Sequence, residues 1–318
     1  MSKNTFVLID GNAILHRSYH AMPRFMVDGK LVNAIYGFIS TLFSTIERFE
    51  PKYLAVAFDV KAPTFRDAIF KEYKAKRVKP EQEFYDQIPD VWEFVRTMDI
   101  PLLTKEGFEA DDIIGTLAKK VNGDLGEGEV IIVTGDQDTL QLVDNRTKVA
   151  MPAMGKIKET VYDVSGVHGK LGISPEQVAD YKALSGDPSD NIPGVRGIGE
   201  KGATELLKEF GNIEGIYEYL EKSQIPIIND QSNPNDQIIK IKPRIVQLLL
   251  EGRDDAFMSK LLATIKTDVE FDFKLSDAKL HDFDEQKVEQ FLDKYRFRSL
   301  IRRMPKSHRV SGQQESLF

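Results

Sequence analysis

The first half of the chain alternates between two hydrophobic patterns. Short apolar runs rich in β-branched residues lie at 5–9, 53–58 and 130–134, and segments with helical periodicity lie near 33–49, 83–98 and 110–121. Apolar runs of this length that alternate with helices are typical of strands buried on both faces of a parallel sheet. The pattern therefore predicts an α/β fold with a mostly parallel central sheet flanked by helices.

The pattern becomes helical after about residue 165, with Gly- and Pro-rich connections at 186–202. The polar stretch 223–237 has the composition of a loop, and 304–318 that of a mobile tail. We therefore expect an α/β core at 1–165, a helical subdomain at 166–303 and a flexible tail at 304–318.

The amino-acid composition excludes several kinds of functional site. The 318 residues include no cysteine, which excludes disulfides, thiolate zinc sites and cysteine nucleophiles. None of the five histidines pairs with another at metal-ligand helical spacing. The N-terminus has no signal-peptide pattern, and no apolar run approaches membrane-spanning length. We expect a cytoplasmic protein that does not associate with membranes.

Carboxylates follow the three predicted strands, at Asp10, Asp59 and Asp136. Because ligands of an open parallel sheet bind outside the carboxyl ends of its strands, these three side chains should converge. Six further acidic residues lie at short spacing in motif-like stretches. They are Glu109, Asp111, Asp112, Asp138, Asp187 and Asp190.

A crevice with many carboxylates and neither histidine nor cysteine selects Mg²⁺ or Mn²⁺. Two such ions stabilise the attacking and leaving oxygens of a phosphoryl displacement, and a metal-bound water serves as nucleophile. The alternative is helix capping, a common role of Asp after a strand. Capping explains a single residue as well as metal binding does, but not nine in this arrangement.

The net charge of −7 argues against a nucleic-acid partner, but the distribution of charge does not. Residues 61–79 hold seven basic and two acidic residues, and residues 294–309 hold seven basic and none acidic. The first stretch interleaves its cations with Phe65, Phe70 and Tyr73, a pattern suited to phosphates and unpaired bases. We interpret about 61–90 as an arch over the active site; a solvated basic helix is the alternative.

A glycine-rich run at 194–203 contains G-x-G-x-x-G at 197–202. A dinucleotide site needs a strand directly before it, and a turn precedes this one. A Walker A loop needs Lys where Glu200 stands. A helix–hairpin–helix over 194–210, with Lys201 opening its second helix, fits better and would grip a duplex backbone without reading its sequence. A plain turn between helices is the alternative.

These motifs together resemble the 5′ nuclease family of flap endonucleases and 5′→3′ exonucleases, and most closely the N-terminal nuclease domain of bacterial DNA polymerase I. The similarity is strongest over residues 5–210 and weaker to about 300. The matching stretches are Leu8-Ile-Asp10-Gly-Asn, Ala57-Phe-Asp59 with Phe65-Arg66, Tyr73-Lys74-Ala-Lys-Arg77, Gly107-Phe-Glu109-Ala-Asp111-Asp112, Thr134-Gly-Asp136-Gln-Asp138, Gly186-Asp187 to Asp190-Asn-Ile-Pro-Gly, and Gly197-Ile-Gly199-Glu-Lys201.

The resemblance implies a PIN-like nuclease core and roles for individual residues. Asp10, Asp59, Glu109 and Asp111 would hold a first metal ion. Asp136, Asp138 and Asp187 or Asp190 would hold a second, with Asp111 as a candidate bridge and Asp112 as a nearby or water-mediated ligand. Arg17, Arg66, Lys74 and Arg77 would engage the scissile phosphate or the 5′ strand, and Tyr73 would stack on a base. Gly197, Gly199 and Lys201 would bind the duplex, with K⁺ held by the hairpin carbonyls.

The implied activity is structure-dependent 5′ nuclease cleavage of branched, nicked or flapped DNA and of RNA primers in replication and repair. A chain of 318 residues has no room for proofreading and polymerase domains. It would therefore be either a stand-alone nuclease or a fragment, and we expect a monomer. The ending Gln314-Glu-Ser-Leu-Phe318 resembles a bacterial sliding-clamp-binding motif anchored by Gln314, Leu317 and Phe318; an interdomain linker is the alternative.

Three other functions compete with a 5′ nuclease. A ribonuclease with the related small nuclease fold would lack the basic arch and the glycine hairpin. A phosphatase with an aspartyl nucleophile needs Asp-x-Asp after its first strand, and Asn12 stands at the second position. A catalytically silent DNA-junction or clamp-binding adaptor would be favoured by loss of a metal carboxylate, and no such loss is apparent.

Overall fold

The computed structural model describes residues 4–121, 123–153, 159–222, 241–281 and 283–305. The chain divides into two units. The sheet unit comprises Met1–Thr64, Val78–Asp163 and Ile265–Phe318, and the helical unit comprises Phe65–Arg77 and Val164–Thr264. None of the helices in the described part of the chain has both the length and the apolarity needed to cross a bilayer.

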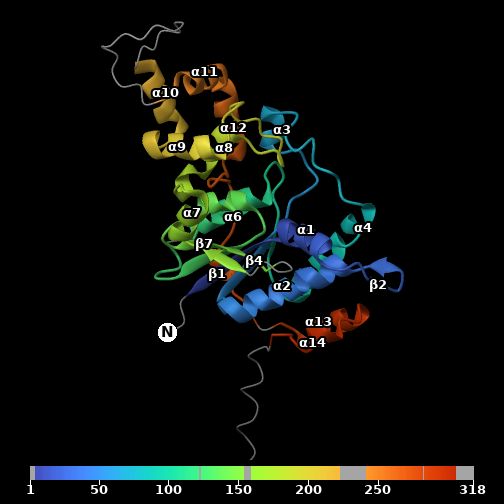
Figure 1. The fold of residues 1–318 in the computed structure, drawn as a ribbon. Helices are drawn as coiled ribbons and strands as arrows, with labels where there is room; N and C mark the ends of the chain where they lie inside the picture. The colour runs from blue at the N-terminus through green and yellow to red at the C-terminus, as the bar shows by residue number, and fades with distance from the viewer. Residues whose placement is uncertain (1–3, 122, 154–158, 223–240, 282, 306–318) are drawn as a thin grey trace, which may run out of the picture. The chain divides into compact units, whose positions relative to one another are not determined.

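A six-stranded sheet in the order β5-β4-β1-β6-β7-β8 forms the centre of the sheet unit (Figure 1). Strand β1 pairs in parallel with β4 and β6, while β8 pairs antiparallel with β7 at one edge. The mostly parallel sheet predicted from the sequence is confirmed. The strands are β1 Thr5–Asp10, β4 Tyr53–Ala57, β5 Leu102–Leu103, β6 Glu129–Val133, β7 Thr147–Met151 and β8 Thr160–Tyr162; β2 Met26–Val27 and β3 Lys30–Leu31 form a separate hairpin.

Helices cover both faces of this sheet because its central strands are apolar on both sides (Figure 1). Alternate residues such as Val7, Ile9 and Val56 pack in one core with α1, α2, α5 and α13, while α6 contacts β1 and β4. The helices of this unit are α1 Gly11–Ala21, α2 Asn33–Phe49, α4 Gln82–Tyr85, α5 Ile88–Thr97, α6 Ala110–Lys120, α13 Glu285–Lys294 and α14 Arg298–Ile301, with 3₁₀ turns η1 Gln137–Leu142 and η3 Leu275–Ala278.

The turn from β1 into α1 depends on Gly11. A Cβ atom at this position would lie 2.4 Å from the ring of Phe58. Phe58 follows β4 and is 1% exposed, so its ring has little room to move. Only glycine therefore lets the chain turn directly after Asp10 while Phe58 remains packed.

In the helical unit, α8 and α9 flank the glycine-rich connection for which the sequence predicts a helix–hairpin–helix. Gly194 and Gly197 have φ angles of 62° and 92°, which glycine adopts without steric cost. The helices of this unit are α3 Phe65–Ile69, α7 Val164–Leu171, α8 Val178–Ser185, α9 Glu200–Phe210, α10 Ile213–Lys222, α11 Pro243–Glu251 and α12 Arg253–Ala263, with a 3₁₀ turn η2 Pro175–Gln177.

Residues 65–77 belong to the helical unit, although the sequence pattern assigned them to the α/β core. Arg66, in α3, is 1% exposed. Its Nε donates to the Leu262 carbonyl at 2.9 Å, and its Nη2 donates to the Thr264 carbonyl at 3.0 Å. Arg66 thus fastens the basic segment to the end of α12, a long-range contact that no local pattern reveals.

The second difference concerns the C-terminal end of the chain. Residues 265–303, predicted to continue the helical subdomain, return to the sheet unit. Phe291 and Leu292 of α13 are buried in the core beneath the sheet. The amphipathic pattern of these helices was visible in the sequence, but the surface that they cover was not.

The close approach at Gly11 predicts a stability effect. We expect Gly11→Ala to lower the free energy of unfolding by about 1–3 kcal/mol, because the added methyl overpacks the site against Phe58. Gly123→Ala is the control, since a Cβ there meets nothing within 4 Å. Urea unfolding measures both; equal stability of the two variants would contradict the prediction.

The contacts of Arg66 predict that its removal loosens the helical unit. We expect Arg66→Ala to cost about 2–4 kcal/mol, since it leaves buried carbonyls unpaired and opens a cavity. It should also speed amide hydrogen exchange over residues 67–77. Lys76→Ala, exposed in the same segment, should change stability by less than about 0.5 kcal/mol. Exchange rates over 67–77 that are unaltered in Arg66→Ala would show that this anchor is dispensable.

Candidate active site

Three carboxylates stand at or just beyond the ends of adjacent parallel strands of the sheet unit. Asp10 is the last residue of β1, while Asp59 and Asp136 lie just beyond β4 and β6. Asp10 pairs in register with Ala57, and Ile9 with Val133, so the three strands end at nearly the same level. The ends of the three strands that carry these carboxylates therefore lie side by side at one edge of the sheet.

Asp10 is held by donors from two elements. Its Oδ1 accepts from the Ala13 amide of α1 at 2.9 Å, and its Oδ2 accepts from the Thr134 hydroxyl at 2.9 Å. Burial raises the pKa of Asp10, and the negative charges of Asp59 and Asp136 raise it further. The hydrogen bonds from Ala13 and Thr134 oppose this rise, and the resulting pKa is about 7. The three carboxylates therefore interact electrostatically.

Asp59 links the end of β4 to the start of α6. Its Oδ1 accepts from the Ala110 amide at 2.7 Å, and its Oδ2 accepts from Asn12 Nδ2 at 2.6 Å. Because Ala110 is the first residue of α6, its amide has no partner inside the helix. Asp59 thus holds the helix that carries the next acidic group.

The first turn of α6 contains Glu109, Asp111 and Asp112. Glu109 and Asp112 form a capping box in which the Glu109 amide donates to Asp112 Oδ2 at 3.1 Å. Asp112 is fully buried, and its Oδ1 accepts from the Lys266 amide at 2.8 Å. Asp112 thus has no exposed surface and binds backbone amides through both oxygens, a combination that favours a role in fixing α6 over direct metal ligation.

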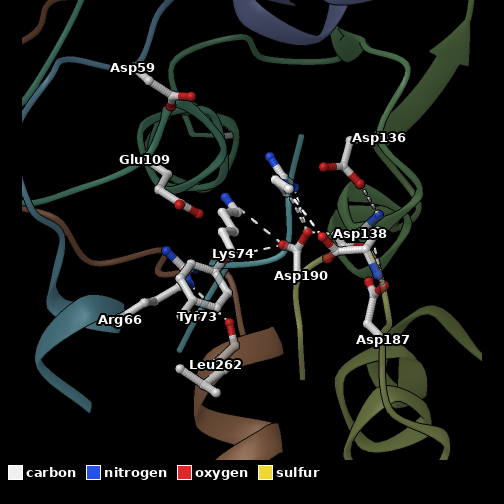
Figure 2. Close-up of polar contacts among 12 residues, drawn as sticks. Asp59, Arg66, Tyr73, Lys74, Glu109, Asp136, Asp138, Asp187, Asp190 and Leu262 are labelled. Atoms are coloured by element: carbon white, nitrogen blue, oxygen red, sulfur yellow. Dashed lines mark hydrogen bonds and ion pairs between the residues drawn. The ribbon is translucent and has the colours of Figure 1, made fainter. Parts of the chain in front are cut away.

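Asp136 and Asp138 lie at the start of η1, which follows a turn that Arg17 of α1 borders. Asp136 caps η1 by accepting from the Asp138 amide at 2.9 Å (Figure 2). The Arg17 guanidinium donates to the Pro152 carbonyl, and burial lowers the pKa of Arg17. A Cβ atom at Gly135 would lie 3.7 Å from Arg17, so this cation borders the turn that carries Asp136.

Asp187 belongs to the helical unit. Lys182 Nζ donates to its Oδ2 at 2.6 Å, and the amide and hydroxyl of Ser189 donate to its Oδ1 at 2.8 and 2.6 Å. Burial alone would raise the pKa of Asp187, but the contacts with Lys182 and Ser189 outweigh burial and lower it to about 2. Asp187 is therefore ionised at neutral pH.

Asp190 binds the basic segment of the same unit. Its carboxylate accepts from Tyr73 Oη at 3.2 Å and from the Arg77 guanidinium, and lies 3.9 Å from Lys74 Nζ (Figure 2). Its carbonyl accepts from the Lys74 amide at 2.9 Å. The structure thus gathers three of the predicted DNA-binding residues around one predicted metal ligand.

The glycine hairpin leads directly into α9. Gly199 is the N-cap of α9, and the Gly199 carbonyl accepts the Ala203 amide at 2.9 Å. The Lys201 side chain is 91% exposed and lies 3.9 Å from Glu205. A cation beside a glycine turn, open to solvent, is suited to a phosphate backbone.

No group of three or more His, Asp or Glu side chains within the described ranges is arranged to hold a metal ion. The donor set nevertheless fits a hard divalent cation, because it consists of carboxylates. Burial, and to a lesser extent repulsion from Asp59 and Asp136, disfavours the charged form of Asp10, and a bound cation would offset both effects. The metal ligands thus remain a prediction, supported by the strand-end geometry.

Two site residues were missed by the sequence reasoning. Asn12 binds Asp59, and Thr134 binds Asp10 and accepts the Asp136 amide at 3.0 Å. Both stand inside motifs that were interpreted through their acidic members, and neither residue had been given a role at the site. The predicted clamp-binding residues Gln314, Leu317 and Phe318 lie outside the described residues.

Comparison with known families covers most of the chain. Residues 5–172 match the model of the 5′-3′ exonuclease N-terminal resolvase-like domain, and residues 173–286 match that of the 5′-3′ exonuclease C-terminal SAM fold. The boundary between the two models falls near the start of the helical region predicted from the sequence.

Curated relatives extend this similarity. The chain is 39% identical over 302 residues to DNA polymerase I of Caldicellulosiruptor bescii, covering 94% of the chain and 33% of that relative. It is 36% identical over 316 residues to DNA polymerase I of Bacillus subtilis, covering 99% and 34%. The chain thus spans about a third of the length of these relatives.

Solved structures share the fold. A bacteriophage T5 5′-exonuclease with bound zinc superposes with a TM-score of 0.64 at 22% identity, covering 92% of this chain and 99% of that one. The catalytic core of Rad2 in complex with DNA substrate superposes with a TM-score of 0.60 at 18% identity, covering 92% and 88%. Given the two domain models that together span residues 5–286, the chain belongs to the 5′-3′ exonuclease family.

Proposed function

We propose that this protein is a structure-dependent 5′ nuclease, a 5′→3′ exonuclease and flap endonuclease that hydrolyses phosphodiesters of branched, nicked or flapped DNA and of RNA primers. The observation that carries the proposal is the position of Asp10, Asp59 and Asp136 at or just beyond the ends of adjacent parallel strands, in a chain of the 5′-3′ exonuclease family. Its products are a 5′-phosphate and a 3′-hydroxyl, and its roles are in replication and repair.

The proposed cofactors are two Mg²⁺ or Mn²⁺ ions. When bound, such ions supply an activated water and neutralise charge on the phosphoryl group. Asp10, Asp59, Glu109 and Asp111 are the proposed ligands of the first ion. Asp136, Asp138 and Asp187 or Asp190 are those of the second.

The proposed role of Asp112 is to position the first-turn carboxylates. Its contacts with the amides of Glu109 and Lys266 fix the start of α6 to the segment that follows α12. Because its side chain is fully buried and binds these amides, its proposed effect on the cations is through the orientation of Glu109 and Asp111.

The basic groups divide into contact and support roles. Arg17, Lys74 and Arg77 are proposed to engage the scissile phosphate or the 5′ strand, and Tyr73 to stack on an unpaired base. Arg66 is also proposed to engage the phosphate or the 5′ strand. Its hydrogen bonds to the Leu262 and Thr264 carbonyls, however, favour a role in holding the segment that carries Tyr73, Lys74 and Arg77.

The glycine hairpin is the proposed duplex-binding element. Gly197 and Gly199 let its backbone approach a phosphate, Lys201 adds a cation, and K⁺ is the proposed ion at the hairpin carbonyls. We further propose a cytoplasmic monomer that reaches a sliding clamp through Gln314, Leu317 and Phe318.

Cleavage of a 5′-labelled double-flap DNA tests the proposal. With Mg²⁺ we expect cuts near the flap junction that disappear in EDTA. Asp136→Asn should reduce the rate by at least about 100-fold while retaining DNA binding in a gel-shift assay, because an amide is a poorer ligand for a hard cation. Asp99→Asn, at an exposed position with a φ of 55°, is the matched control and should cleave like the wild type.

The competing adaptor predicts a different result. If the wild type binds the flap yet leaves it intact with both Mg²⁺ and Mn²⁺, the nuclease proposal fails. Cleavage that proceeds equally in EDTA would reject the role of the carboxylates.

The raised pKa of Asp10 predicts how the metal-free protein responds to pH. A folded pKa of about 7, against 3.8 unfolded, means that the folded state retains a proton that the unfolded state has lost. Stability should therefore fall as pH rises from about 4 to 7, by up to about 4 kcal/mol. Asp10→Asn removes this loss.

Thermal unfolding in EDTA measures the effect. Asp10→Asn should raise the Tm above that of the wild type clearly more at pH 8 than at pH 5. Saturating Mn²⁺ at pH 8 should stabilise the wild type and reduce the difference. An equal Tm difference between Asp10→Asn and the wild type at both pH values would show that the Asp10 charge does not destabilise the folded state.

A further inference from the structure

Thr134 connects two of the strand-end carboxylates. It is the first residue after β6 and is fully buried. Its hydroxyl donates to Asp10 Oδ2 at 2.9 Å and accepts from the Asp136 amide at 3.0 Å. One small side chain therefore spans the ends of β1 and β6.

The Thr134 hydroxyl acts as a donor to one neighbour and as an acceptor from the other. A threonine hydroxyl has one proton, and here the proton points to Asp10. The Asp136 amide occupies the acceptor side of the same oxygen. Because the Ala13 amide binds the other oxygen of Asp10, both ends of that carboxylate are fixed by donors. The rotation of the Asp10 carboxylate is thus set by Thr134 together with the start of α1.

The series of hydrogen bonds extends from Asp136 to Asp138. The Asp138 amide donates to Asp136 Oδ1 at 2.9 Å, so hydrogen bonds link Asp10, Thr134, Asp136 and Asp138 in sequence. Every link is inside the sheet unit and uses either a backbone amide or the Thr134 hydroxyl. Thr134 is the member of this series whose side chain cannot itself be a charged ligand.

A purely structural explanation is that Thr134 ends a strand and fills space. Thr147 offers the comparison, since it is equally buried, at 1% exposure, and stands in the same sheet. Thr147 pairs with Val130 near the amino end of β6, whereas Thr134 follows the carboxyl end. Loss of the hydroxyl at the two positions therefore separates general packing from an effect on the carboxylates.

We infer that Thr134 is a positioning residue that holds Asp10 and Asp136 in the orientation needed to bind a divalent cation. The inference rests on the proposed function, because it assigns Asp10 and Asp136 as ligands. Hydrogen bonds to ligating carboxylates fix their direction, and removal of such partners typically weakens metal binding 10–100-fold.

Calorimetric titration of the full chain with Mn²⁺ alone tests the inference. Thr134→Val, nearly equal in shape but without the hydroxyl, should weaken Mn²⁺ binding by about tenfold or more. Thr134→Ser, which keeps the hydroxyl, should bind within about twofold of the wild type. Thr147→Val should leave the affinity unchanged. Circular dichroism verifies folding, and Thr134→Ala replaces the valine variant if that variant does not fold.

Three outcomes overturn the inference: wild-type affinity in the hydroxyl-free variant, equal weakening in Thr134→Ser, or equal weakening in Thr147→Val. A wild type that binds no Mn²⁺ also overturns it. A wild type that binds Mn²⁺ with the expected dependence on Thr134 but cuts no flap DNA leaves the inference standing. The proposed nuclease function alone then fails.

Discussion

The parallel pairing of β1 between β4 and β6 is the constraint on which the rest of the sheet unit depends. Strand β1 has a paired strand on each side and helices on each face of the sheet, and all six of its residues are therefore buried. Parallel strands share a direction, and each of these three ends at an aspartate or shortly before one. The hydrophobic burial of the strands therefore supplies the free energy that gathers negative charge at one edge.

That gathering of charge explains the polar contacts around the edge. Backbone amides at the starts of α1, α6 and η1 donate to Asp10, Asp59 and Asp136. Amides at the first turn of a helix have no partner within it and carry partial positive charge, so they stabilise carboxylates nearby. The capping explanation and the metal explanation of these aspartates are therefore compatible, because a carboxylate oxygen that accepts one hydrogen bond has a second lone pair for a cation.

Sequence reasoning identified the sheet and the acidic motifs because both have local signals. Buried β-branched runs mark the strands, and aspartates directly after them mark the edge. The ends of α2 and α6 agree closely with the predicted ranges, since amphipathic periodicity defines them.

The partners of Arg66 and Asp190 were not evident from the sequence, because they are residues distant along the chain. Arg66 resembled a phosphate ligand, but its guanidinium binds carbonyls almost 200 residues along the chain. Asp190 resembled a metal ligand, and in the helical unit it binds Tyr73 and Arg77. Residue type indicates which bonds a side chain can form, but the fold decides which partner is near enough to form them.

The order in which the chain visits its two units has a consequence for biosynthesis. The core beneath the sheet includes Phe291, Leu292 and Leu300, which follow the last residue of the helical unit. A ribosome therefore completes the whole helical unit before it releases the segments that close the core of the sheet unit. Until then, the nascent sheet unit exposes apolar surface that α13 and α14 later cover, and chaperone binding and early proteolysis should concentrate on that intermediate.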